Sequence, residues 1–184
     1  GGNLCLDTRC FWVNQTEDWR RSIDWCHKCD CDTGADCRVI PNQNTLCVAT
    51  YQGDLAPCMM VLGAKIHLAG PDGKRSMNLD EFYALDGMKR NVLEVGEFVT
   101  HITLPIESDE LEGDYQKLRL RESWDFPEAG VAASWKRNDS GIEQLYVATT
   151  ACESIPRLHL EQTSVALEEW NGKESANALA ENIR

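Results

Sequence analysis

Basic residues are scarce in this chain. It has 18 Lys and Arg against 30 Asp and Glu, which gives a formal net charge of −12. A nucleic-acid surface needs Lys and Arg clustered so that they neutralise phosphates, and the sequence offers no such cluster. We therefore expect no nucleic-acid partner. An acidic surface mainly keeps a protein solvated.

Long apolar runs are also absent. No run approaches the roughly 20 residues that a helix needs to cross a bilayer, and no basic-then-apolar leader opens the chain. The nine cysteines are an odd number, and 184 residues can bury a core without crosslinks. We expect a cytoplasmic protein with reduced thiols and no membrane association. Because the chain starts at Gly1-Gly2-Asn3 without a Met, we also expect a fragment of a longer protein.

The cysteines that are present are unevenly spread. Six of the nine lie between positions 10 and 47, in a polar stretch that also contains Trp12, Trp19 and Trp25. A core would spread its cysteines more evenly, so the pattern indicates a metal site. The candidate ligands, Cys10, Cys26, Cys37 and Cys47, are separated by 16, 11 and 10 positions. This spacing differs from the CxxC pairs of a zinc ribbon or finger.

Two other interpretations of these thiols stay open. Cys26, Cys29, Cys31 and Cys37 can make a compact zinc site, to which His27 can contribute. Alternatively, the thiols are scattered and hold no metal.

The cysteine-rich stretch has few apolar residues of its own. Thr16 followed by two acidic residues predicts a helix start, and Trp19, Ile23 and Cys26 then share one helical face. Residues 29–44 are rich in Asp, Gly, Asn and Pro, which predicts an irregular loop. A metal cluster can order such a segment, since ligation supplies free energy that apolar burial does not.

The rest of the chain predicts an α+β fold. Asp54 can cap a helix over residues 56–62, and the pattern then gives strands at 65–68 and 98–104 with a short helix at 79–85. After an acidic linker at 107–114 come three strands and two helices. We expect the strands at 115–121, 129–136 and 142–150, and the helices at 163–170 and from 175.

Gly1, Gly2 and Asn3 can form a tight turn whose backbone passes close to a ligand. Backbone N–H groups in such a turn can cradle a pyrophosphate, and glycine avoids a side-chain clash. Ordinary turns use the same residues, and Asp54 at a helix start is usually a cap.

Taken together, several motifs resemble the FAD-binding medium subunit of molybdenum hydroxylases, and most closely the branch of the 4-hydroxybenzoyl-CoA reductase beta subunit. The resemblance runs through most of the chain. Its motifs are Gly-Gly-Asn-Leu-Cys-Leu-Asp-Thr-Arg-Cys at 1–10, Asp24-Trp25-Cys26, Gly53-Asp54-Leu55-Ala56-Pro57, Asp86-Gly87-Met88, Gly96-Glu97 with Leu104-Pro105, Tyr115 with Lys117 and Arg121, and Asp125-Phe126-Pro127.

The resemblance implies a domain organisation. Residues 1–106 would form the second subdomain of a PCMH-type FAD-binding domain, with an inserted iron-sulfur loop at about residues 10–47. Residues 107–184 would form a C-terminal domain of three antiparallel strands plus helices. The first FAD-binding subdomain of the family would precede this chain.

The resemblance also implies cofactors. Cys10, Cys26, Cys37 and Cys47 would bind a 4Fe-4S cluster, with Cys29 or Cys31 as substitutes for the two middle ligands. Backbone at Gly1, Gly2 and Asn3 would contact the FAD diphosphate, and Asp54 would bind the sugar-like chain of the flavin. Phe98 or Val99 would touch the isoalloxazine ring.

The implied function is electron transfer within a larger oxidoreductase. Its partners would be a large molybdenum-cofactor subunit, a small 2Fe-2S subunit and a ferredoxin-like donor, as in the reductive dehydroxylation of an aromatic acyl-CoA. Two alternatives remain. One is the FAD subunit of an oxidising hydroxylase of the xanthine or CO dehydrogenase type, and the other is a non-enzymatic zinc-stabilised interaction module.

Overall fold

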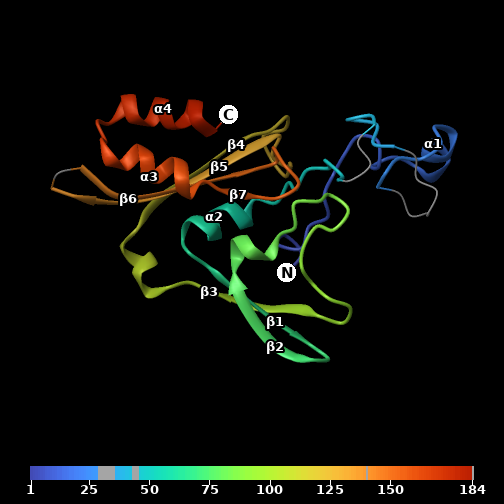
Figure 1. Ribbon diagram of the computed structural model, residues 1–184, viewed down its shortest axis with the longest axis horizontal. Coiled ribbons are helices and arrows are strands. Elements are labelled where there is room, and N and C mark those ends of the chain that lie inside the picture. The colour runs from blue at the N-terminus through green and yellow to red at the C-terminus, as the bar shows by residue number, and fades with distance from the viewer. Residues whose placement is uncertain (29–35, 43–45, 140, 184) are drawn as a thin grey trace.

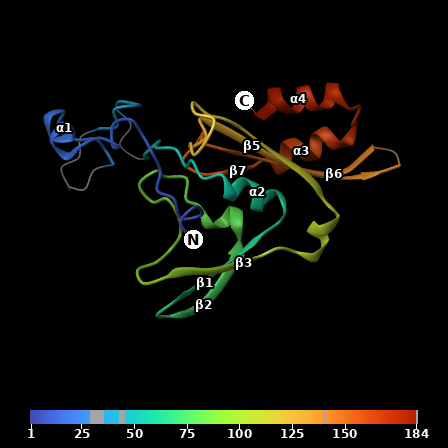
Figure 2. The ribbon, with the colours of Figure 1, turned by 180° about the vertical axis from the view of Figure 1, so that it is seen from behind.

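A computed structural model describes residues 1–28, 36–42, 46–139 and 141–183 (Figure 1). Helices and antiparallel sheets are both present, which confirms the α+β prediction. Two sheets and their helices form a body, and the described residues between 9 and 46 form a lobe that projects from one end of it (Figures 1 and 2).

The first sheet has three strands in the order β2-β1-β3. They are β1 (Lys65–Gly70), β2 (Gly73–Asn78) and β3 (Phe98–Thr103). The 3-10 helix η1 (Leu79–Phe82) follows β2 directly, and it starts in a capping box made by Asn78 and Glu81. The sequence pattern did not predict β2, because its side chains are almost all exposed and carry no alternation of apolar and polar residues.

The second sheet has four strands in the order β4-β5-β6-β7. They are β4 (Glu112–Leu118), β5 (Ala129–Asn138), β6 (Gly141–Thr150) and the short β7 (Arg157–Leu158), which the sequence did not predict. Helices α3 (Leu160–Glu168) and α4 (Lys173–Ile183) pack on one face of this sheet. The 3-10 helix η2 (Ile106–Glu110) connects the two sheets along the chain. It overlaps the linker predicted at 107–114, but the end of that stretch already belongs to β4.

Helix α2 (Leu55–Val61) lies between the two sheets in the main hydrophobic core. It ends before Gly63, whose positive φ of 70° suits glycine at a helix C-terminus. Side chains from α2, β1, η1 and the second sheet meet there, and the largest fully buried ones include Tyr51, Phe82, Ile66, Leu68 and Leu79. The core therefore joins the two sheets into one body.

The described part of the lobe contains one helix, α1 (Glu17–Ser22), whose N-cap is Thr16 as predicted. The expectation that this helix presents Cys26 was wrong. Asp24 and Trp25 both have positive φ, 60° and 59°, so the helix ends before them and Cys26 lies beyond it, outside any helix or strand. Residues 36–42 contain no helix or strand, and the rest of the predicted loop lies outside the described residues.

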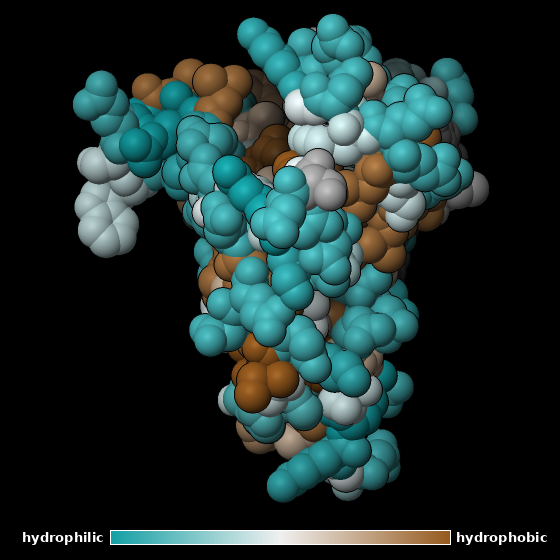
Figure 3. Space-filling model, turned by 90° about the vertical axis from the view of Figure 1, so that its left-hand side faces the viewer, coloured by the Kyte–Doolittle hydropathy of each residue, from teal (hydrophilic) through white to brown (hydrophobic). Residues whose placement is uncertain are grey.

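The surface seen in Figure 3 is mainly hydrophilic, with hydrophobic side chains in small separate groups. This agrees with the acidic composition. Among the described helices, none combines the length and the apolar character that a membrane span requires.

Candidate functional site

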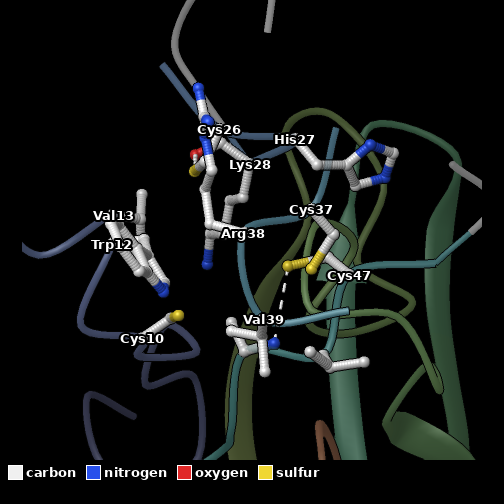
Figure 4. Close-up of a pocket in the computed structure, with 12 residues that line it drawn as sticks. Cys10, Trp12, Val13, Cys26, His27, Lys28, Cys37, Arg38, Val39 and Cys47 are labelled. Atoms are coloured by element: carbon white, nitrogen blue, oxygen red, sulfur yellow. Dashed lines mark hydrogen bonds between the residues drawn. The ribbon is translucent and has the colours of Figure 1, made fainter. Parts of the chain in front are cut away.

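The four cysteines singled out from the sequence line one cavity in the lobe. Cys10, Cys26, Cys37 and Cys47 come from four separate segments and meet around it (Figure 4). The other lining residues are Trp12, Val13, His27, Lys28, Arg38, Val39, Val48 and Ala49. Cys26 is close enough to Cys10 and Cys37, and Cys47 to Cys37, for their charges to interact. The fold therefore gathers thiols that the sequence spreads over 37 positions.

In the described part of the lobe, burial is confined to two of these thiols. In the described residues between 9 and 46, only Cys26 and Cys37 are buried, each 7% exposed. Burial raises the pKa of Cys26 and of Cys47. A polar loop that buries mainly sulfur has little apolar free energy to hold it.

Four thiols are the donor type that Fe–S clusters use, since such clusters are held by Cys thiolates. As the side chains stand in the described segments, no group of three or more His, Cys, Asp or Glu could hold a metal ion. The zinc alternative uses Cys29 and Cys31, which lie outside the described residues, while His27 is a lining residue of the same cavity.

Two cations tie the loops around this cavity together. Lys28 Nζ donates to Asp7 Oδ1 at 2.8 Å and to Thr8 O at 3.0 Å. Arg38 Nε donates to Trp25 O at 3.1 Å, and its Nη2 donates to Ile23 O. A cluster carrying four thiolate ligands would be anionic, so both cations would face negative charge.

Three aromatic rings, those of Phe11, Trp12 and Trp19, pack together beside the cavity. Trp12 lines the cavity and packs against Phe11 and Trp19, with ring centroids 5.6 and 5.9 Å apart. Trp25 instead receives the guanidinium of Arg20 over its ring at 5.3 Å. Rings beside a cluster limit water access, which is one factor that sets its potential.

A second group of predicted residues meets at the start of α2. Asn3 Oδ1 accepts from the backbone N–H of Leu55 at 2.9 Å, and the Tyr51 hydroxyl donates to Asn3 O at 2.9 Å. The Gly-Gly-Asn turn therefore lies beside Asp54. A Cβ added to Gly1 or Gly2 would meet nothing within 4 Å, so packing within the described chain does not require glycine there.

Asp54 does not cap α2 with its side chain. Its Oδ1 accepts instead from the Tyr115 hydroxyl at 2.8 Å and from Lys117 Nζ at 2.9 Å. Burial, followed by the bond to Asp54, raises the pKa of Tyr115, so its hydroxyl stays a donor. Sequence reasoning gave Tyr115 and Lys117 no role. Their spacing of two places them on one face of a strand, but nothing local shows that this face meets Asp54.

Phe98 and Val99 are adjacent on β3 and face opposite sides of the sheet. Val99 packs against the main core, whereas Phe98 is 60% exposed. Of the two, Phe98 has the surface that a ligand could contact.

Comparison with known proteins defines the class. The model of the FAD binding domain in molybdopterin dehydrogenase matches residues 1–107. A chain of the CO dehydrogenase from Oligotropha carboxidovorans superposes with a TM-score of 0.63 at 25% identity, covering 71% of this chain and 46% of that one. Quinoline 2-oxidoreductase from Pseudomonas putida 86 gives 0.60 at 20% identity, covering 70% and 44%. The fold is thus that of an FAD-binding domain of the CO dehydrogenase type.

The chain belongs to the family of FAD-binding domains of molybdopterin dehydrogenases, an oxidoreductase family. The FAD-binding subunit PaoB of an aldehyde oxidoreductase from Escherichia coli K12 is 29% identical over 147 residues. That match covers 76% of this chain and 45% of PaoB, so the chain spans less than half the length of this relative.

Proposed function

We propose that this chain is part of an electron-transfer subunit that binds FAD and a 4Fe-4S cluster in a molybdenum-containing hydroxylase or reductase. A bound cluster would exchange single electrons and the flavin one or two. The chain itself holds and tunes these groups and binds no substrate. The domain boundaries at 1–106 and 107–184 are part of the proposal.

The observation that carries the cluster is the cavity lined by Cys10, Cys26, Cys37 and Cys47. These four thiols would be the ligands. Lys28 and Arg38 would balance their charge, and Trp12 would restrict water. Since the lobe buries so little else among its described residues, a ligated core gives a physical reason for its order.

The FAD site rests on the family match and on the geometry at the start of α2. The open space over Gly1 and Gly2 would admit the diphosphate to the backbone N–H groups. Both bonds to Asp54 are made at Oδ1, which leaves Oδ2 to accept from a hydroxyl of the flavin's sugar-like chain. Exposed Phe98 would provide an apolar surface for the isoalloxazine ring.

The partners proposed are a large molybdenum-cofactor subunit, a small 2Fe-2S subunit and a ferredoxin-like donor, in the cytoplasm. The reaction proposed is the reductive dehydroxylation of an aromatic acyl-CoA, as in 4-hydroxybenzoyl-CoA reductase. The inserted thiol lobe supports this branch. An oxidising hydroxylase is the second candidate, because the relative PaoB is the subunit of an aldehyde oxidoreductase.

The test is the content of iron, acid-labile sulfide and zinc in the chain produced without oxygen. We expect about four irons and four sulfides per chain, lost in Cys10→Ser and Cys47→Ser and kept in Cys152→Ser, whose thiol lies outside the cavity. About one zinc without sulfide, unaffected by the first two changes, would instead establish the zinc module.

A further inference from the structure

Cys47 differs from the other three cavity thiols because the body of the protein holds its backbone. Its N–H donates to Asp86 Oδ1 at 3.1 Å, and its carbonyl accepts from Gly87 N at 2.8 Å. The same carbonyl accepts from Ser154 Oγ at 3.0 Å, in the turn after β6. Three hydrogen bonds from two distant segments therefore fix this residue.

Gly87 lies directly against the Cys47 side chain. A Cβ built on Gly87 would be 2.9 Å from Cys47 Sγ, 2.9 Å from Ala49 N and 3.0 Å from Ala49 Cβ. Such approaches are well inside van der Waals contact. Gly87 is not among the glycines with positive φ, so its backbone conformation is open to other residues. What requires glycine here is the space that the Cys47 thiol occupies.

Hydrogen bonds hold the turn that contains Gly87 in place. Asp86 Oδ1 also accepts from Met88 N at 3.0 Å, which closes the turn on itself. The Thr8 hydroxyl donates to the Gly87 carbonyl, and Thr8 O accepts from Lys28 Nζ at the edge of the cavity. An added methyl group would therefore push on Cys47 and Ala49 and not on the turn.

The thiol itself is held toward the cavity. Cys47 Sγ accepts from the backbone N–H of Ala49 at 3.5 Å, the bond drawn dashed in Figure 4. Moving the sulfur breaks this bond and shifts the thiol relative to Cys37, which also lines the cavity.

We propose that Gly87 is a positioning residue for the Cys47 thiol, and that the Asp86-Gly87 turn and Ser154 together set where this sulfur stands in the cavity. The proposed function is needed only to explain what the positioned thiol would do, which is to bind the cluster. The placement of the thiol is a property of the chain itself, and it can be measured without metal.

The first experiment uses the metal-free chain and follows alkylation of each cysteine by iodoacetamide with peptide mapping. In Gly87→Ala we expect the rate at Cys47 to change by about fivefold or more, as overpacking of a tight contact displaces the side chain. The rate at Cys10 should stay the same. Met88→Ala, in the same turn but half exposed, is the matched control and should leave both rates unchanged.

The second experiment measures iron, sulfide and the electron paramagnetic resonance spectrum of the reduced chain. Gly87→Ala should lose iron or show an altered spectrum. Ser154→Ala removes one hydrogen bond and adds no atom, so it should change the iron content or the spectrum in the same direction but by less. Thermal unfolding of both variants shows whether the body stays folded. If Gly87→Ala does not fold, the iron content and spectrum of Ser154→Ala test the positioning role.

The outcomes separate the two proposals. A wild-type chain without iron and sulfide refutes the proposed cluster, while a changed Cys47 rate in Gly87→Ala still supports the positioning role. A wild-type chain with its cluster, together with unchanged alkylation and spectrum in both variants, overturns the positioning role and leaves the cluster standing.

Discussion

The body and the lobe are held together in different ways. In the body, large apolar side chains such as Phe82 and Ile66 are fully buried between two sheets. In the described part of the lobe, the buried side chains are two thiols, and Phe11 is 68% exposed. Burial of apolar surface supplies about 25 cal/mol per Å², so this term favours the body far more than the described part of the lobe. Under the proposed function, ligation of the thiols would supply the order of the lobe.

Loss of one lobe thiol should produce the largest contrast. In Cys26→Ser we expect the cluster to be lost and the lobe to be cleaved by a protease about tenfold faster or more, because cleavage follows the open population. The body should remain intact. Limited proteolysis with mass spectrometry checks this, with Cys152→Ser as the control. Equal protection of the lobe in both variants would contradict the difference between the two regions.

Truncation in the core should weaken the body instead. We expect Phe82→Ala to lower the free energy of unfolding by about 3–5 kcal/mol, through lost burial and the cavity left behind. Phe11→Ala, in the lobe, should change it by about 0.5 kcal/mol or less. Urea unfolding followed by circular dichroism measures both. Similar losses in the two variants would show that the lobe shares the core of the body.

Asp54 tests whether the flavin site belongs to the body. Asp54→Asn removes a charged acceptor for Tyr115 and Lys117, and we expect FAD to bind about tenfold more weakly. The exposed Asp114 offers a control of the same chemistry, since Asp114→Asn should leave FAD affinity unchanged. Flavin fluorescence titration gives the two dissociation constants, and iron content should be the same in both. Equal FAD affinity in the two variants would remove Asp54 from the site.

A small pH effect should be confined to the body. The hydrogen bonds from Arg75 lower the pKa of Glu97 from 4.5 to about 2. Ionised Glu97 therefore contributes stability that is complete above about pH 4.5 and is lost as the pH falls toward 2. The effect is small because the pair is near the surface. Thermal unfolding of Glu97→Gln should lack this dependence, and an unchanged pH profile would show that the pair does not stabilise the fold.

The sequence predicted the body better than the lobe. Alternation in β5 and β6 and the residues around α2 identified those elements, since burial on one face leaves a periodic pattern. It missed β7, which is too short for a pattern. In the lobe, helical spacing suggested that α1 reaches Cys26, but the left-handed residues Asp24 and Trp25 end it earlier. Backbone conformations of this kind leave no periodic signal.

The same limit applies to the sites. Residue types and spacing pointed to Cys10, Cys26, Cys37 and Cys47, and the fold places them around one cavity. Nothing local connects Asp54 to Lys117, which lies 63 positions away, or Cys47 to Gly87. Such contacts depend on the packing of α2 against the second sheet and on the turn at Asp86, which only the tertiary structure determines.

Hydrogen–deuterium exchange, measured on the chain with and without iron and sulfide, tests the central claim most directly. Loading should slow exchange in residues 11–28 and 36–42 and leave residues 55–103 unchanged. If exchange in those lobe segments is the same in both forms, ligation does not order the lobe and the assignment of its thiols to a cluster is contradicted.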